Sequence, residues 1–321
     1  MTEAPNKRTI LLESGTNELE VMEFSIGTQH FGVNVAKVRR LLRWDHKNLT
    51  RLDFGPPGVI GSLHFMNQQV LLIDLRKVLE IADPIADEER QLILVCEFNH
   101  HIYAFVIDAV NRIHRASWKS LQPVEGILAH QSPYTTSSLQ IDGRVIMILD
   151  MEHILSEIVP EQSIIGSTAK MTSIQTNFDR SSVHILFAED SAMIRKITVE
   201  QLNKSGFTNI TTKNNGKLAF EYLQELQQKA RTEGKQLSDY LHLVLSDIEM
   251  PEMDGLTFCR MFRQDLGVKN IPFVVYSSLI NDQMATKCKS VGANAWMSKP
   301  EIDKIVHQID LFCVQAATTA V

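Results

Sequence analysis

The apolar residues of this chain change their spacing on either side of a polar segment near its middle. Upstream they recur at every second position, as in Met22, Phe24 and Ile26, which is the pattern of strands with one buried face. Downstream, short apolar runs alternate with helical segments, which is typical of a parallel sheet covered on both faces. Residues 161–181 between the two patterns are mostly small or polar, as in a linker. The 321 residues are enough for two domains, so we expect an all-β domain followed by an α/β domain.

The predicted β domain contains a repeat. Val70–Leu75 and Ile146–Met151, which lie 76 positions apart, share a four-residue apolar run, an aspartate and an apolar residue. Phe31–Val35 corresponds to Tyr103–Ile107 at an offset of 72. Two similar β subdomains, each a small barrel, would explain the repeat. Chance recurrence of short apolar runs is the alternative. Strands are expected at residues 22–26, 31–35, 70–73, 92–98, 102–107 and 145–149.

Composition excludes several classes of function. The net charge of −6, without a run of Lys and Arg, argues against a nucleic-acid-binding protein. No window approaches the ~20 apolar residues of a membrane span, so we expect a cytoplasmic protein that is not inserted in a membrane. The cysteines have no paired or metal-ligand spacing and are expected to be buried, reduced thiols. They are Cys96, Cys259, Cys288 and Cys313.

Acidic residues follow two of the strands expected in the second domain. Glu189 and Asp190 come after the apolar run 183–188, and Asp247 comes after the run 241–245 and one serine. Open parallel sheets bind ligands at the carboxyl ends of their strands, so the three carboxylates should converge there. Such carboxylates either protonate or hold a cation, and hard oxygen ligands favour Mg²⁺. We expect Asp190 to bind the metal directly and Glu189 to bind it directly or through water. Solvated turn residues are the structural alternative.

Two more polar residues should reach the same edge. Ser277 and Lys299 each close a later apolar run. A carboxylate can attack phosphorus and form an acyl phosphate when a metal and a cation neutralise the phosphoryl oxygens. Asp247 is therefore the predicted phosphoacceptor and a further metal ligand, and the backbone carbonyl of Glu249 can supply another. Lys299 would pair with the phosphate, and the Ser277 hydroxyl would donate to it.

At these positions the second domain resembles a two-component receiver domain, similar to the single-domain chemotaxis regulator CheY. The likeness covers residues 183–315, and the spacings from Asp247 to Ser277 and from Ser277 to Lys299, 30 and 22 residues, fit the family. Two residue pairs of its turn are also present: Met250-Pro251 and Asp254-Gly255. The resemblance implies a flavodoxin-like fold with five parallel strands. It also implies a domain that promotes only its own Mg²⁺-dependent phosphorylation and dephosphorylation, rather than an enzyme.

The receiver-like region has a long spacing between two of its acids and a tryptophan close to its lysine. Asp190 and Asp247 are 57 residues apart, more than in a minimal receiver, and we assign the excess to a surface insertion in the polar stretch 227–239. Trp296 stands three residues before Lys299, where receivers carry an aromatic that moves inward on phosphorylation. By resemblance Trp296 and Ser277 form a switch pair; a core tryptophan is the other interpretation.

The first domain resembles CheW-type coupling domains, which consist of two five-stranded barrels and bridge chemoreceptors and the histidine kinase CheA. The segments that carry the resemblance are Phe31–Val38, Ile73–Arg76 and Arg112–Arg115. With the leader 1–17, a coupling domain at 18–160, the linker and a receiver at 182–321, the chain resembles CheV proteins. It departs from the family at Ser62–Phe65, where an Asn-Leu-Arg-Gly stretch is usual. His64 there is either a changed partner contact or a surface residue.

Three functions remain open from the sequence. The first is a chemotaxis adaptor that binds CheA and methyl-accepting chemoreceptors, associates with membrane receptor arrays through them, and is regulated by phosphorylation of Asp247. The second is a phosphate sink that drains the kinase without changing the coupling. The third is a response regulator with an enzymatic or DNA-binding output. It ranks last because the β domain offers no catalytic nucleophile paired with a general base and no helix-turn-helix.

Overall fold

The computed structural model describes residues 18–45, 48–52, 55–83, 90–98, 101–124, 132–159 and 179–319, the last six without side-chain detail. The chain divides into two compact units, of which one spans Glu18–Pro160 and the other contains the residues after it. None of the helices in the described part of the chain is long and apolar enough to span a membrane.

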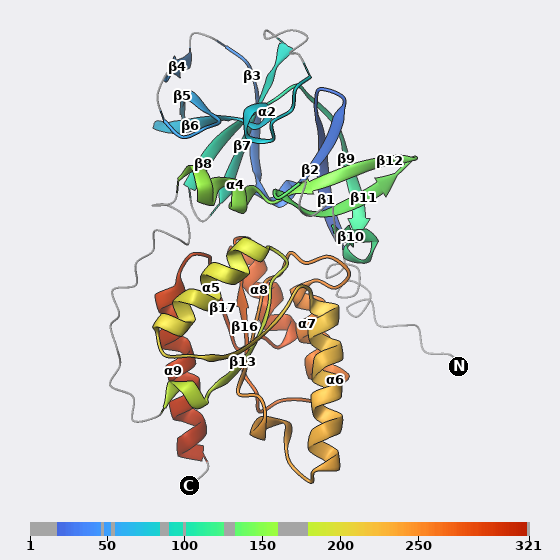
Figure 1. Ribbon diagram of the computed structural model, residues 1–321, viewed down its shortest axis with the longest axis vertical. Coiled ribbons are helices and arrows are strands. Elements are labelled where there is room, and N and C mark those ends of the chain that lie inside the picture. Colours follow the sequence, from blue (N-terminus) through green and yellow to red (C-terminus); the bar gives the residue numbers. More distant parts are fainter. Residues whose placement is uncertain are drawn as a thin grey trace, which may run out of the picture. The chain divides into compact units, whose positions relative to one another are not determined.

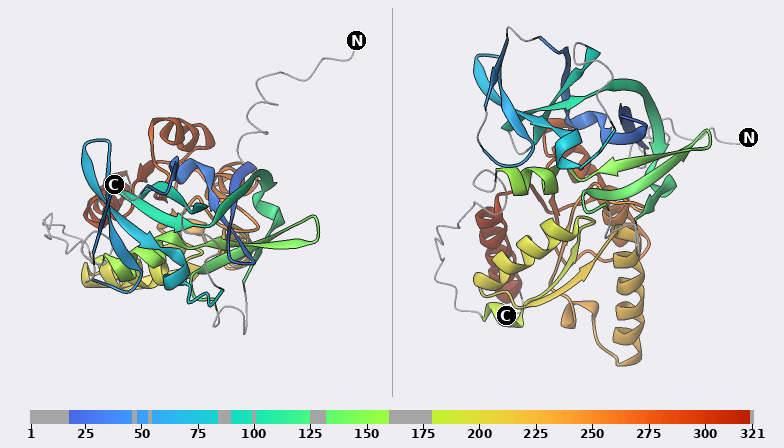
Figure 2. Two further views of the ribbon diagram at one scale, coloured as in Figure 1. Left: turned by 90° about the horizontal axis from the view of Figure 1, so that it is seen from above. Right: turned by 45° about the horizontal axis from the view of Figure 1, so that its top comes forward.

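The first unit is built from two six-stranded sheets (Figure 1). Figure 2 shows the unit from two further sides, with the hairpin of β11 and β12 projecting from it. One sheet has the order β10-β11-β12-β2-β1-β9, with β1 Glu18–Ile26, β2 Gln29–Asn34, β9 Ala109–Ser117, β10 Leu121–Pro123, β11 Thr135–Ile141 and β12 Arg144–Leu149. The other has the order β3-β7-β8-β6-β5-β4, with β3 Val38–Arg43, β4 Leu49–Arg51, β5 Val59–Phe65, β6 Gln68–Asp74, β7 Leu92–Phe98 and β8 His101–Ile107.

Six of the twelve strands lie where the sequence predicted strands. Among the other six are the short strands β4 and β10, which contain three residues each. A three-residue strand cannot display an apolar alternation long enough to be recognised in the sequence.

The predicted repeat is confirmed by the strand pairing. In one sheet β6 runs parallel to β8 with Leu71 opposite Tyr103, and in the other β12 runs parallel to β2 with Met147 opposite Phe31. Leu71 and Met147 are 76 positions apart, and Phe31 and Tyr103 are 72 positions apart. Equivalent residues of the two copies therefore pair with each other in both sheets. The helices α2, Leu75–Val78, and α4, Met151–Ile158, begin at equivalent places, because Asp74 and Asp150 each accept a backbone N–H at the helix start.

The two copies exchange their first hairpins. The hairpin β1–β2 of the first copy lies in the sheet with β9 to β12 of the second, while β7–β8 of the second copy lies with β3 to β6 of the first. The Arg76 guanidinium in α2 donates to the carboxylate of Asp108, which connects β8 of one sheet to β9 of the other, and to the backbone carbonyl of Asp83. Each sheet therefore depends on strands from both halves of the domain.

A buried carboxylate ties four strands of the first sheet together. Glu23 on β1 is fully buried, and it contacts His114 Nε2 at 2.6 Å and His30 Nδ1 at 2.8 Å. Asn111 Nδ2 donates to it at 3.0 Å, and Arg144 Nη1 lies 3.6 Å away. Burial alone would raise the pKa of Glu23, but the hydrogen bonds and the nearby cation outweigh it and lower that pKa to about 2. The ionised carboxylate is thus the favoured form in the folded protein.

We predict that Glu23→Gln lowers the free energy of unfolding by roughly 3 kcal/mol at pH 7. Because the folded-state pKa lies below the ordinary value of 4.5, the advantage of the wild type should be complete above pH 4.5 and shrink as the pH falls towards 2. Urea unfolding followed by tryptophan fluorescence at several pH values measures this. The control is Glu20→Gln on the same strand, whose half-exposed side chain pairs with Arg115 and should contribute less than about 1 kcal/mol. Equal stability of Glu23→Gln and wild type at pH 7 would contradict the prediction.

The second unit contains the predicted parallel sheet of five strands with helices on both faces. The sheet has the order β14-β13-β15-β16-β17. Its strands are β13 His184–Ala188, β14 Asn209–Lys213, β15 Leu243–Ser246, β16 Phe273–Tyr276 and β17 Ala295–Met297. The helices are α5 Ala192–Lys204, α6 Gly216–Thr232, α7 Gly255–Gln264, α8 Asp282–Val291 and α9 Ile302–Thr319.

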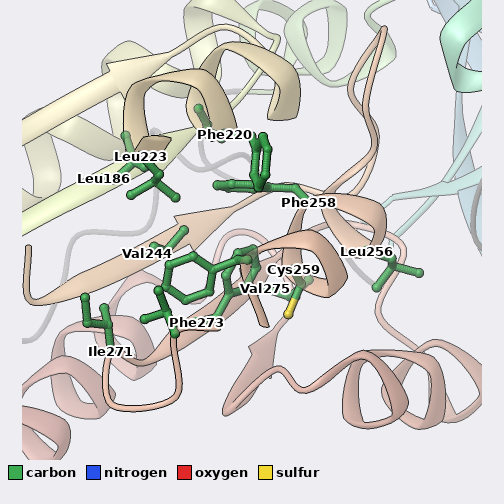
Figure 3. Close-up of a cluster of buried hydrophobic side chains, with 14 of the residues drawn as sticks. Leu186, Phe220, Leu223, Val244, Leu256, Phe258, Cys259, Ile271, Phe273 and Val275 are labelled. Carbon is green, nitrogen blue, oxygen red and sulfur yellow. The ribbon is translucent and has the colours of Figure 1, made fainter. Parts of the chain in front are cut away.

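Alternate residues of the strands enter two separate cores. Leu186, Val244 and Phe273 pack against α6, α7 and α8, as Figure 3 shows for the cluster around Phe258. Leu243 and its neighbours on the other face pack against α5 and α9. Both faces being covered explains why these strands read as continuous apolar runs.

The expected surface insertion at 227–239 is only partly a loop. Helix α6 continues to Thr232, and a short 3₁₀ helix follows at Leu237–Asp239. Ala230 and Leu237 are buried. The stretch is polar on average but keeps apolar residues at helical spacing, so its inner face packs on the domain.

Candidate functional site

The three predicted acids meet at the carboxyl end of the receiver-like sheet. Glu189 and Asp190 follow β13, and Asp247 follows β15, its neighbour in the sheet. Ala188 stands opposite Ser246 in the parallel register, and the Asp247 N–H donates to the Ala188 carbonyl at 2.9 Å. One oxygen from each of the three carboxylates therefore lies within 4.8 Å of the others.

Lys299 completes this cluster from the end of β17. Its Nζ lies 2.8 Å from Glu189 Oε2 and 2.9 Å from Asp247 Oδ2. The lysine side chain is 2% exposed, and those of Glu189 and Asp247 are 1% and 5% exposed. The ammonium therefore bridges two carboxylates that water does not screen.

The electrostatics favour the addition of a cation. Burial raises the pKa of Glu189 well above its usual value, and the charges of Asp247 and Asp190 raise it further, while Lys299 opposes them. Glu189 Oε2 is buried, and the Lys299 ammonium lies 2.8 Å from it, which leaves acceptor capacity on this carboxylate oxygen. A buried oxygen with free acceptor capacity, beside two more carboxylates, fits a hard cation such as Mg²⁺. Asp190, which is partly exposed, gives the cluster an opening to solvent.

The turn after Asp247 is held by close backbone contacts. Asp247 Oδ1 accepts the Ile248 N–H at 2.6 Å. A Cβ on Gly255 would stand 1.9 Å from the Asp247 carbonyl oxygen, so only glycine fits there. Asp254 accepts the N–H groups of Leu256 and Thr257 at the start of α7, and burial raises its pKa to about 6. This is the physical role of the Asp254-Gly255 pair in the motif.

The remaining predicted residues lie around this cluster. Ser277 follows β16 and is fully buried; its N–H donates to the Met297 carbonyl, and its Oγ accepts the Leu279 N–H at 3.4 Å. Trp296 on β17 is partly buried and packs against the core on the α6 to α8 side. Glu249, two residues after Asp247, is also partly buried. The geometry assigns no single role to Trp296, so the switch interpretation stays a prediction.

Sequence reasoning missed Arg195 in the first turn of α5. Its Nη1 donates to the backbone carbonyls of Glu189 at 2.6 Å and Asp190 at 3.3 Å. The arginine thus restrains the loop that carries both acids. An arginine four residues after the helix-capping Ser191 was the available signal, but its target could not be identified without the folded loop.

Comparison with known proteins agrees with this geometry. Residues 20–159 match the family model of the CheW-like domain, and residues 185–310 match that of the response regulator receiver domain. The chain joins a CheW-like domain to a receiver domain. The same pair of domains was expected from the sequence, and the prediction is confirmed.

The relatives that span most of the chain are CheV proteins. The chain is 28% identical to chemotaxis protein CheV3 of Helicobacter pylori, over 91% of this chain and 94% of that protein. It is 24% identical to CheV2 of the same organism, over 86% and 88% of the two chains, and 24% identical to CheV1, over 91% and 93%. The architecture is that of a CheW-like coupling adaptor fused to a receiver domain.

We predict that Lys299→Met increases the affinity of the unphosphorylated protein for Mg²⁺ by about tenfold, because the ammonium competes with the metal for two buried carboxylates. Isothermal titration calorimetry with MgCl₂ measures the affinity directly. Lys217→Met is the matched control, since Lys217 pairs with Glu252 at 2.7 Å on the exposed surface and should leave the affinity unchanged. An unchanged or weaker affinity in Lys299→Met would show that the lysine does not compete with the metal.

Proposed function

We propose that this protein is a chemotaxis adaptor that couples chemoreceptors to a CheA-type histidine kinase in the cytoplasm, and that phosphorylation of Asp247 regulates the coupling. The CheW-like domain supports the coupling part. The observation that carries the regulatory part is the buried cluster in which Lys299 bridges Asp247 and Glu189 at 2.9 and 2.8 Å. The kinase and the receptors would also hold the protein at the membrane arrays.

The phosphorylation step needs little from the protein beyond positioning. An oxygen of the Asp247 carboxylate attacks the phosphorus of a phosphohistidine, the new O–P bond forms, and the N–P bond to the imidazole breaks. Asp247, Glu189, Asp190 and the Glu249 carbonyl would hold Mg²⁺. When bound, Mg²⁺ neutralises charge that develops on the phosphoryl oxygens. Lys299 already lies 2.9 Å from Asp247 Oδ2 and can pair with a phosphoryl oxygen.

The phosphoryl group would change the contacts around the cluster. It adds a charge of about −1.5 to −2 and three strong acceptors. Lys299 would shift from two carboxylates to the phosphate, and the Ser277 hydroxyl would donate to it instead of accepting the Leu279 N–H. Trp296 lies next to Val275 in the sheet and three residues from Lys299, so it is the aromatic best placed to follow this rearrangement. Such a local change can bias a two-state surface that partners bind.

We expect Asp247→Asn to abolish stable labelling by a ³²P-phosphorylated CheA-type kinase, because the amide does not form the acyl phosphate. Labelling is measured by autoradiography after rapid quenching in the presence of MgCl₂. Asp265→Asn, at the exposed end of α7, is the control and should be labelled like the wild type. Equal labelling of the Asp247→Asn protein would reject Asp247 as the phosphoacceptor.

A regulated adaptor and a phosphate sink differ in the effect of phosphorylation on partner binding. We expect the beryllofluoride adduct, formed with Mg²⁺ and stable on the time scale of a titration, to change the affinity for kinase or receptor at least about threefold, which corresponds to a fraction of a kcal/mol. Surface plasmon resonance on the full chain, with and without the adduct, measures this. Asp247→Asn treated in the same way is the control. Identical affinities in all samples would favour the sink.

A further inference from the structure

The repeat in the CheW-like domain allows its two copies to be compared with each other. Strand β3 reads Val-Arg-Arg-Leu-Leu-Arg from Val38, and β9 reads Val-Asn-Arg-Ile-His-Arg from Val110, 72 positions later. Each is the terminal strand of its sheet. Each also presents an exposed apolar residue between arginines, Leu41 at 41% and Ile113 at 50% exposure. The two strands thus carry the same side-chain arrangement at equivalent positions.

The arginines of the second copy are paired within the protein. Arg115 donates to Glu20, opposite it on β1, at 3.0 Å, and Arg112 lies 4.0 Å from Asp142 in the turn between β11 and β12. Both contacts are made on the surface.

In the first copy the equivalent arginines face apolar residues instead of acids. Arg43 stands opposite Leu92, which takes the place of Glu20. Met66, 71% exposed, occupies the turn position equivalent to Asp142. Arg40 and Arg43 are exposed, and neither forms an ion pair with another described residue. The two arginine positions that pair with acids in the second copy thus have no described acidic partner in the first copy.

These two arginines stand on the rim of a groove of about 390 Å³. The sheet curls so that residues of its two edge strands, β3 and β4, line the same groove together with β5. The floor is apolar and consists of Leu63, Phe65 and Ile93. His64, from the segment that departs from the usual coupling-domain pattern, and Met66 in the turn after it lie on the exposed rim. Asp45 is the acid on this rim, and Asn48 donates to it at 2.8 Å.

We propose that this groove docks an acidic peptide segment of a partner protein, with its apolar side chains on the floor and its carboxylates on Arg40 and Arg43. Charge complementarity supports this occupant, since arginine is well suited to paired recognition of carboxylates. The apolar floor between the sheet edges suits side chains better than a polyphosphate backbone. The inference rests on the adaptor function and identifies the chemistry by which one coupling partner is recognised.

The test compares equivalent substitutions in the two copies. Full-length wild type, Arg40→Gln/Arg43→Gln and Arg112→Gln/Arg115→Gln are titrated against a purified CheA-type kinase and a chemoreceptor cytoplasmic fragment at 50 and 300 mM NaCl. The groove variant should bind one of these two partners about tenfold more weakly at low salt and lose most of the salt dependence of that interaction. The control variant should change the affinity less than twofold.

A third variant tests the comparison between the copies directly. Met66→Asp places an acid at the position of Asp142, so it should pair with Arg40 and weaken the same interaction several-fold without removing either arginine. Circular dichroism melting checks folding of each variant, and labelling of Asp247 by acetyl phosphate should be unchanged in all of them.

The outcomes separate the docking proposal from the adaptor function. If the wild type binds and both double variants bind as tightly, or lose affinity equally, the docking proposal is rejected and the adaptor function is retained. Failure of the wild type to bind either partner overturns both. A third result is that the groove variant loses binding to vesicles of phosphatidylglycerol and phosphatidylcholine while it still binds both protein partners. This result would assign the arginines to a lipid surface and overturn the proposal.

Discussion

The receiver domain depends on the position of one ammonium group. Lys299 lies between Glu189 and Asp247 at 2.8 and 2.9 Å, and all three side chains are almost inaccessible to water. Two carboxylates in such surroundings repel each other and lose hydration, so an opposing cation is needed to keep either of them charged. The parallel sheet supplies these groups together because it brings the ends of β13, β15 and β17 to one edge. The folded domain and its proposed phosphorylation chemistry thus both require a cation beside the two buried carboxylates.

The CheW-like domain is constrained in a different way, by the exchange of hairpins between its two copies. Since β1–β2 belongs to the sheet of the second copy and β7–β8 to that of the first, neither half can complete its own sheet. The domain should therefore fold as one cooperative unit. Duplication has also placed similar edge strands on both sheets, and their differences in charge pairing distinguish two otherwise equivalent surfaces.

Much of the architecture could be predicted from residue patterns because the decisive signals are local. The strand predicted at Leu92–Phe98 has these bounds in the structure, because a continuous apolar run marks it in the sequence. The predictions were incomplete where local polarity misled. Strands β3, β4, β5, β9, β10 and β11 were not predicted. The polar stretch 227–239 was assigned to a surface insertion, although α6 extends into it to Thr232.

The sequence by itself determined the two domain classes, the repeat and the identity of the acids, the serine and the lysine at the strand ends. It could do so because strand ends of a parallel sheet must share an edge, whatever the loops between them. Only the tertiary structure decided which charges are neutralised. Arg195 is bound to the carbonyls of the acidic loop, and Arg115 pairs with Glu20 while Arg43 stands opposite Leu92. Such pairings join residues far apart in the chain, and their electrostatic energy depends on distance and burial, which only the folded chain defines.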